Sequence, residues 1–307
     1  MMKKLFDKNR KEIQQLFDWV LANPYSDFYR RKFTDSLPAR ISTYDDFQKI
    51  PFLYREEIQN TRLDKRAFVS KNQVVRYSIS EGTAGAAPLV IPRDSQLSLL
   101  EDYSYNQLVK LDIRVLLALV PTFSPVRMSL FERAKGKSVL LMGDINDYEL
   151  TANLAKKAGI KGIFSTPSLL NNLIRSLEEQ DFDMQSIKWV SIGRELCTGQ
   201  FFSYITEEFS KAKIFFRFPA TENDGLAGFQ CEYLSGKSPF LYHPNARLFL
   251  EIIDKNGKLL REGETGEIVC TDIQSKAFPF LRYKSRIPAS LSKQECKCGN
   301  NLILELA

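Results

Sequence analysis

The chain has 307 residues, of which 44% are hydrophobic and 26% charged, an ordinary composition for a globular protein of one or two domains. These proportions exclude a disordered tail, a collagen-like fibre and a small disulfide-stapled scaffold. The formal charge of +6 arises from 43 Lys and Arg against 37 Asp and Glu. Because the basic residues are spread along the chain, we expect no nucleic-acid partner.

His243 is the single histidine, so catalysis by a histidine base has one candidate.

The sequence predicts no membrane or export segment. The longest apolar run, residues 115–120, is far shorter than the ~20 residues needed to span a bilayer. The N-terminus, residues 1–8, is interrupted by charges before an apolar core of signal-peptide length can form. We therefore expect a cytoplasmic protein without a membrane partner, whose cysteines are free, catalytic or metal-bound rather than paired in disulfides.

The N-terminal part of the chain predicts helices. Apolar residues recur at three- and four-residue spacing from Phe6 to Leu21, which indicates an amphipathic helix that ends at Pro24. Shorter helices are expected over residues 44–50 and from Tyr54 onward.

From about residue 75 the pattern changes to short apolar strands that alternate with helices. The expected strands are 74–78, 115–121, 138–142, 162–165, 189–192 and 213–218, and the expected helices include 150–158 and 167–179. Such alternation predicts a largely parallel sheet covered on both faces.

The last part of the chain is richer in strands. Residues 248–254 and 266–273 predict strands, and Asn256-Gly257 marks a turn after the first of them. We therefore expect an α/β core with an N-terminal helical segment over residues 1–230, and a smaller β-rich subdomain over residues 231–307.

A loop rich in small residues follows the strand expected at 74–78. It contains Ser80, Gly82, Thr83 and Gly85, and glycines let backbone N–H groups surround an anion while hydroxyls add donors. The loop is not a Walker A motif, because no Gly-Lys-Ser/Thr follows. Taken alone, this composition is more typical of a plain connecting loop than of a phosphate-binding one.

The same loop resembles the phosphate loop of adenylate-forming (AMP-binding) enzymes, Ser-Gly-Thr-Thr-Gly-x-Pro, and further matches follow in that family's order. They are residues 191–195 for a Gly-Gly-Glu strand end, 218–222 for Tyr-Gly-x-Ser/Thr-Glu, 263–269 for Gly-Glu-x-Gly-Glu-Leu-Val and 278–286 for Leu-Pro-Ile-Ile-Arg-Tyr-Arg-Thr-Arg. Residues 25–30 and 50–52 also resemble the phenylacetate-CoA ligase branch. The resemblance implies an α/β fold, the large N-terminal domain of these enzymes, with a small zinc-stapled β-rich subdomain.

The resemblance also implies an activity, the AMP-forming activation of a small carboxylic acid as its acyl-adenylate, followed by transfer to CoA or a carrier-protein thiol. Glu222 would bind Mg²⁺ and Thr221 would donate to the α-phosphate. The residues that would contact ATP or AMP are Ser80, Gly82, Thr83, Gly85, Glu195, Phe218, Pro219, Ala220 and Tyr283. From the residues alone, an acid that caps a helix is the favoured interpretation of Glu222.

An aromatic acid is one expectation for the substrate. Tyr103 and Phe123 would line the acid pocket, although aromatic residues at such spacing also suit an ordinary core.

The sequence departs from the family pattern at several positions. Ile287 stands where an Asp grips the ribose hydroxyls, and an isoleucine accepts no hydrogen bond; the loss of a charged acceptor costs roughly 1.5–3 kcal/mol of affinity. Glu81, Ala84 and Pro219 replace residues of other types near the nucleotide. The chain also ends where the family's C-terminal lid domain, with its lysine, begins, so a separate protein is expected to supply that domain.

Three interpretations therefore stay open. The protein forms an acyl-adenylate with a partner that supplies the lid, or carries out another chemistry on a bound carboxylate. Alternatively, it is a non-catalytic nucleotide- or carboxylate-binding or scaffold protein.

Three cysteines and the histidine form a candidate zinc set. Cys296 and Cys298 are separated by one residue and followed by a glycine, while Cys231 precedes His243. Four soft N and S donors suit tetrahedral Zn²⁺, and some phenylacetate-CoA ligase relatives resemble this pattern. We expect a structural zinc, with free thiols and a surface histidine as the alternative. The two other cysteines, expected in the core, are Cys197 and Cys270.

Overall fold

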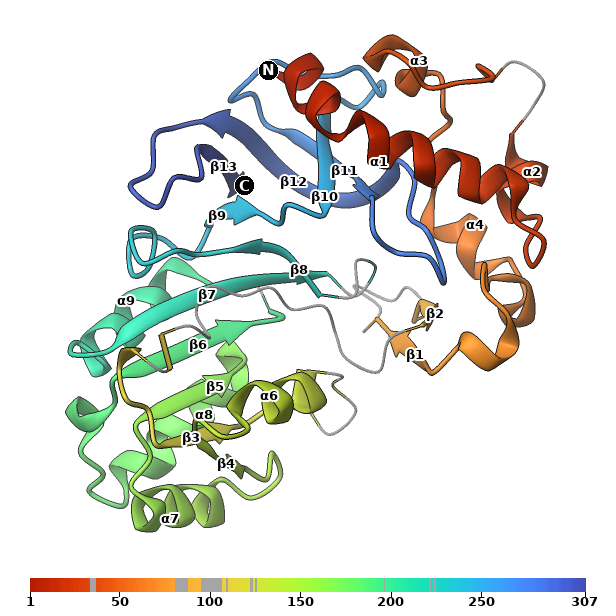
Figure 1. Ribbon diagram of the computed structural model, residues 1–307. Coiled ribbons are helices and arrows are strands. Elements are labelled where there is room, and N and C mark those ends of the chain that lie inside the picture. Colours follow the sequence, from red (N-terminus) through yellow and green to blue (C-terminus); the bar gives the residue numbers. More distant parts are fainter. Residues whose placement is uncertain are drawn as a thin grey trace.

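The computed structural model describes residues 1–33, 37–80, 88–94, 107–108, 110–121, 124, 126–195, 197–220, 222 and 225–307. Within these residues, one long sheet has the strand order β10-β11-β12-β13-β9-β8-β7-β6-β5-β3-β4, and β1 and β2 form a separate two-stranded sheet. Figure 1 shows the parallel strands with α6–α9 in its lower half, and the antiparallel strands with α1 and α3 in its upper half.

The N-terminal helices begin with α1 (Met2–Ala22), which confirms the helix expected there. Its buried face carries Phe6, Ile13 and Phe17, as the helical spacing requires. Short helices follow: α2 (Phe28–Lys32), α3 (Tyr44–Gln48), α4 (Arg55–Gln59), η1 (Leu63–Lys65) and η2 (Lys71–Gln73). The hairpin of β1 (Arg76–Ile79) and β2 (Val90–Arg93) then flanks residues 81–87.

Five strands of the sheet run parallel, which confirms the predicted alternation. They are β3 (Val115–Ala118), β4 (Val139–Met142), β5 (Gly162–Ser165), β6 (Trp189–Gly193) and β7 (Lys213–Ala220). The helices among them are α6 (Val126–Ala134), α7 (Tyr148–Ala158), α8 (Pro167–Glu178), η3 (Met184–Ser186) and α9 (Gly199–Glu208). Helix α8 begins as expected, because Thr166 caps it and Pro167 occupies its first turn.

The helices lie on both faces of the parallel strands. Leu170 and Leu173 of α8 belong to the same core cluster as Ile192 of β6, on one face. Leu130 of α6 packs with Phe164 of β5 on the other face. Alternate residues of each strand are therefore buried on opposite sides, as expected for a doubly covered sheet.

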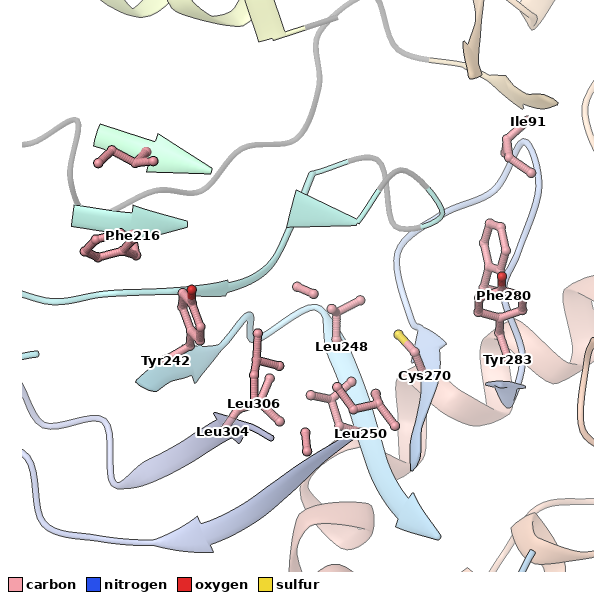
Figure 2. Close-up of a cluster of buried hydrophobic side chains, with 14 of the residues drawn as sticks. Ile91, Phe216, Tyr242, Leu248, Leu250, Cys270, Phe280, Tyr283, Leu304 and Leu306 are labelled. Atoms are coloured by element: carbon pink, nitrogen blue, oxygen red, sulfur yellow. The ribbon is translucent and has the colours of Figure 1, made fainter. Parts of the chain in front are cut away.

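The remaining strands are antiparallel. They are β8 (Gly225–Phe229), β9 (Leu241–Pro244), β10 (Leu248–Ile253), β11 (Gly266–Asp272), β12 (Tyr283–Lys293) and β13 (Leu302–Leu306). Figure 2 shows part of the main apolar cluster that joins the two halves, with Phe216 of β7, Tyr242 of β9, and Leu304 and Leu306 of β13 among its members. A single core thus continues from the parallel strands into the antiparallel ones.

The N-terminal segment is fixed to the antiparallel strands through Arg282. Its guanidinium donates to the carbonyl oxygens of Gln48 and Ile50, both at 2.7 Å, and pairs with Glu251 at 3.0 Å. The hydroxyl of Tyr44 donates to the same Glu251 carboxylate at 2.8 Å. These buried contacts bring the start of α4 beside β12, so that Arg55 lies within reach of the end of β7. The domain division after residue 230 stays a prediction.

Among the helices of the described residues, none combines the length and the apolar character needed to cross a membrane.

Candidate functional site

The candidate site lies where β1, β7 and β12 approach one another. Ser80 directly follows β1, Glu222 follows β7, and Tyr283 begins β12. Ligands of open α/β sheets bind beyond the carboxyl ends of the parallel strands, which is where β7 delivers Glu222. Three of the residues expected to contact a nucleotide or its metal are thus brought together from distant parts of the chain.

Arg55 of α4 connects two of these residues. Its Nη1 lies 3.3 Å from Oε1 of Glu222, and its Nη2 donates to Oγ of Ser80 at 2.9 Å. The hydroxyl of Tyr283 donates to the same Oε1 at 3.3 Å. With side-chain exposures of 10% for Arg55 and 18% for Glu222, this ion pair is largely shielded from water. The sequence pattern did not single out Arg55, because its partners lie far away along the chain.

A second buried arginine approaches the site from β2. Arg93 donates from Nη2 to the backbone carbonyl of Glu222 at 2.9 Å, and from Nε to Oγ of Ser78 at 3.2 Å. The backbone N–H of Leu89 donates to Oγ of Ser80 at 2.9 Å. This hydrogen bond joins the residue that follows β1 to the residue that precedes β2. Two guanidinium groups therefore flank Glu222, and they bring positive charge to the base of the small-residue loop.

Tyr283 stays protonated in this environment. Burial raises its pKa above the ordinary range, and the neighbouring Glu222 charge raises it further. The phenol therefore acts as a donor toward the Glu222 carboxylate at any physiological pH.

The other described residues of the expected set lie at the ends of β6 and β7. Glu195 accepts from the backbone N–H and hydroxyl of Ser168 at 2.9 and 2.8 Å, which attaches it to the first turn of α8. Phe218, Pro219 and Ala220 form the end of β7, where a bulge shifts the pairing with β8. Their contact with a nucleotide stays a prediction.

Several expected site residues lie outside the described residues. They are Gly82, Thr83, Gly85, Tyr103, Phe123 and Thr221.

The four candidate metal ligands converge, although they come from three separate segments. The N and S donor atoms of Cys231, His243, Cys296 and Cys298 all lie within 4.8 Å of one another. His243 Nε2 is 3.3 Å from each of the Cys231 and Cys298 sulfurs, and the Sγ atoms of Cys296 and Cys298 are 3.4 Å apart. Ligand atoms on a tetrahedral zinc are separated by about 3.6–3.8 Å, so the cluster needs little adjustment to hold one.

The surroundings of this cluster favour a cation. Nδ1 of His243 faces the carbonyl oxygen of Leu302 at 2.9 Å, which leaves Nε2 directed at the cysteines. Burial raises the pKa of the Cys231 thiol to about 12 and lowers the pKa of His243. The imidazole is therefore neutral, as a metal ligand must be, and a bound cation would supply the charge that favours the Cys231 thiolate. Cys197 and Cys270 are buried in the main core, as expected.

Known proteins were compared by sequence and by structure. No family model matches the chain, and no curated protein matches it by sequence. Among solved structures, an open conformation of 2-hydroxyisobutyryl-CoA ligase in complex with 2-HIB-AMP and CoA aligns with a TM-score of 0.70 and 15% identity, over 96% of this chain and 67% of that one. A long-chain-fatty-acid-CoA ligase from Archaeoglobus fulgidus aligns with a TM-score of 0.55 and 15% identity, over 75% of this chain and 50% of that one.

VinN gives a similar result, with a TM-score of 0.55 and 16% identity over 75% of this chain and 59% of that one. The chain spans about two thirds of the length of the ligase that it matches over 96% of its own residues. Likenesses at this level of identity establish architecture, and the chain has the fold of the N-terminal domain of adenylate-forming enzymes.

Proposed function

We propose that the protein uses ATP to activate a small carboxylic acid as its acyl-adenylate. The observation that carries this proposal is the contact of Arg55 with both Ser80 and Glu222, at the junction of the small-residue loop and the end of β7. In the reaction, a carboxylate oxygen of the acid forms a bond to the α-phosphorus of ATP, and the bond to the bridging oxygen breaks. Pyrophosphate leaves with that oxygen, and the acyl group remains joined to AMP.

The residues of the site suit a reaction in which charge moves between phosphates. Arg55 and Arg93 provide two cations, and preorganised donors of this kind stabilise negative charge that develops in a transition state. Arg55 would turn from the Glu222 carboxylate to the phosphate groups when the nucleotide binds. No histidine base is needed, which agrees with the position of His243 in the cysteine cluster.

Glu222 fits a magnesium ligand. Mg²⁺ binds through one or two carboxylates together with substrate phosphates, and the Glu222 carboxylate is held in place by Arg55 and Tyr283. When bound, Mg²⁺ supplies further compensation for the charge on the leaving pyrophosphate. Tyr283 would keep the carboxylate oriented while Arg55 moves.

The cysteine–histidine cluster is proposed as a structural zinc site. Four donors complete a tetrahedral shell, so no position stays open for chemistry. Cys231 follows β8, His243 belongs to β9, and Cys296 and Cys298 lie between β12 and β13. The metal would therefore fasten the β12–β13 connection to the junction between the two halves of the sheet.

The acyl acceptor is proposed to be the thiol of CoA or of a carrier protein. One matched ligase was solved with 2-HIB-AMP and CoA in what is described as its thioesterification state. The resemblance of short sequence motifs to the phenylacetate-CoA ligase branch makes an aromatic acid one of the acids to test.

Direct detection of the product tests the proposal. Purified protein is incubated with ATP, Mg²⁺ and a panel of acids, and acyl-AMP is sought by mass spectrometry after denaturation. We expect an acyl-AMP of matching mass with at least one acid, and its loss in Glu222→Gln, with Glu232→Gln as a control for the removal of a carboxylate elsewhere. ATP binding without acyl-AMP for any acid would favour the non-catalytic binding protein instead.

A further inference from the structure

A buried arginine lies at the end of β7, just before the residues that lead to Glu222. Arg217 is 4% exposed, and its guanidinium carbon is 3.6 Å from the centre of the Phe164 ring on β5. Since β6 lies between β5 and β7, the side chain extends across one strand to reach that ring. Its charge is therefore carried along the face of the sheet that α6 covers.

Gly193 provides the room for this crossing. It pairs with Arg217 in the register of β6 and β7. A Cβ atom at Gly193 would lie 3.1 Å from the Arg217 Cβ and 3.4 Å from its guanidinium carbon. Any larger residue at position 193 would press on the arginine, so the pair behaves as one structural unit.

The same face carries a second buried polar group in apolar surroundings. Ser191 is fully buried, and its hydroxyl makes no hydrogen bond to any described residue. It shares its face with Arg217, because Ser191 and Gly193 are two residues apart on β6. Trp189 and Phe215, which lie on the same face, are buried and apolar. Buried hydroxyls are normally satisfied, so this one points to a polar ligand.

We propose that Arg217, with Ser191 beside it, binds a second carboxylate on the acid, and that the substrate is a small dicarboxylic acid. This inference rests on the proposed adenylation, because it places one carboxylate at the α-phosphate near residues 218–222. The other carboxylate then lies on the α6 face. A planar guanidinium meets a carboxylate through two parallel hydrogen bonds, which a neutral acid cannot offer.

The geometry also explains why an arginine is used here. Stacking on Phe164 holds the guanidinium plane in a fixed direction, so little conformational entropy is lost when a carboxylate binds. In apolar surroundings the attraction between opposite charges is stronger than in water. An uncharged acid tail of equal length offers no carboxylate for this paired hydrogen bonding.

Acid selectivity tests the assignment. Exchange of labelled pyrophosphate into ATP is measured with succinate and glutarate, with butyrate and valerate of matching length, and with phenylacetate. The variants are Arg217→Met, which retains the apolar stack on Phe164, and Arg217→Lys, which retains the charge without the planar fork. Arg114→Met removes an exposed arginine that pairs with Asp112 and serves as the control. Calorimetric titration of each acid and of ATP accompanies the exchange, and thermal denaturation checks folding.

We expect the wild-type protein and Arg114→Met to favour the dicarboxylates by about 100-fold or more. Arg217→Met should lose that preference without a change in ATP affinity, and Arg217→Lys should retain part of it. Equal exchange with the monocarboxylates in the wild-type protein, or a uniform loss for all acids in Arg217→Met, would overturn the assignment of Arg217. If ATP binds but no acid supports exchange, the proposed adenylation is contradicted instead. In that case calorimetry still tests whether Arg217 binds the second carboxylate. Dicarboxylate binding that disappears in Arg217→Met supports this role of Arg217. The absence of dicarboxylate binding in the wild-type protein overturns it.

Discussion

Arg55 and Glu222, which are 167 residues apart in sequence, form an ion pair at 3.3 Å across the candidate site. Arg55 belongs to the N-terminal helices and Glu222 follows the central strand β7, so the pair joins two separately built parts of the molecule. The Arg55 guanidinium therefore lies beside the carboxylate that is proposed to bind Mg²⁺. The Glu222 carboxylate thus has a cationic partner before any ligand enters the site.

Arg55→Ala should weaken ATP binding by about 10- to 100-fold, because a charged donor to the phosphates is lost. Arg55→Lys should retain a larger share of the affinity, since it keeps the charge but not the fork that spans Ser80 and Glu222. Calorimetric titration with ATP checks both variants, with Arg114→Ala as the control. Unchanged ATP affinity in folded Arg55→Ala would show that the arginine has only a structural role.

Ile287→Asp should tighten ATP binding by about 10- to 100-fold, because it restores a charged acceptor for the ribose hydroxyls. Ile287 follows Arg286, whose side chain pairs with Glu56 and whose backbone N–H donates to Glu267 at 2.9 Å. These contacts hold this part of the β12 backbone in place for the substitution. The comparison of ATP with 2′,3′-dideoxy-ATP measures the effect, and a gain that is equal for both nucleotides would contradict the ribose interpretation.

Removal of metal should destabilise the β12–β13 region. We expect about one zinc per chain by elemental analysis of protein purified without chelators, and a lower Tm after treatment with a strong chelator. Cys298→Ser should remove both the bound zinc and the response to chelator. Cys270→Ser is the matched control, because this buried cysteine lies outside the cluster. We expect chelator to lower the Tm of this variant further, whatever its starting value. Full stability in metal-free protein would contradict the site.

The buried pair of Glu251 and Arg282 should be essential for the docking of the N-terminal segment. Glu251→Ala leaves Arg282 buried without its carboxylate, which typically costs about 3–5 kcal/mol of unfolding free energy. The double variant Glu251→Leu with Arg282→Met should recover part of that loss, because no uncompensated charge remains. Urea denaturation of Glu251→Leu, Arg282→Met and the double variant measures the coupling, and additive losses would show that the two side chains act independently.

The sequence allowed the prediction of elements whose signals are local. Helix α8 has a capping threonine and a proline in its first turn, and strands β5 and β6 are short buried runs, so each was placed within about a residue of its observed bounds. Strand β12 was not predicted. It contains Pro288 and several charged residues, and it forms a strand only because β11 and β13 pair with it on its two sides.

Some residues of the candidate site could also be predicted from the sequence, and others could not. Ser80, Glu222 and Tyr283 stand within recognisable motifs, and the four metal ligands are conspicuous because cysteine and histidine are scarce. Arg55, Arg93 and Arg217 carry no local signal, because arginines are common and their roles depend on contacts made across the fold. Only their contacts in three dimensions, with Glu222 and with the Phe164 ring, distinguish them from the other basic residues.

The measurement that most directly tests the account is acid-dependent exchange of labelled pyrophosphate into ATP. It reports reversible formation of an acyl-adenylate and requires neither an acyl acceptor nor a thioester. We predict exchange that depends on both an acid and Mg²⁺, and that falls by at least about 100-fold in Glu222→Gln while Glu232→Gln retains it. The absence of exchange with every acid, in folded protein that binds ATP, would contradict the central claim.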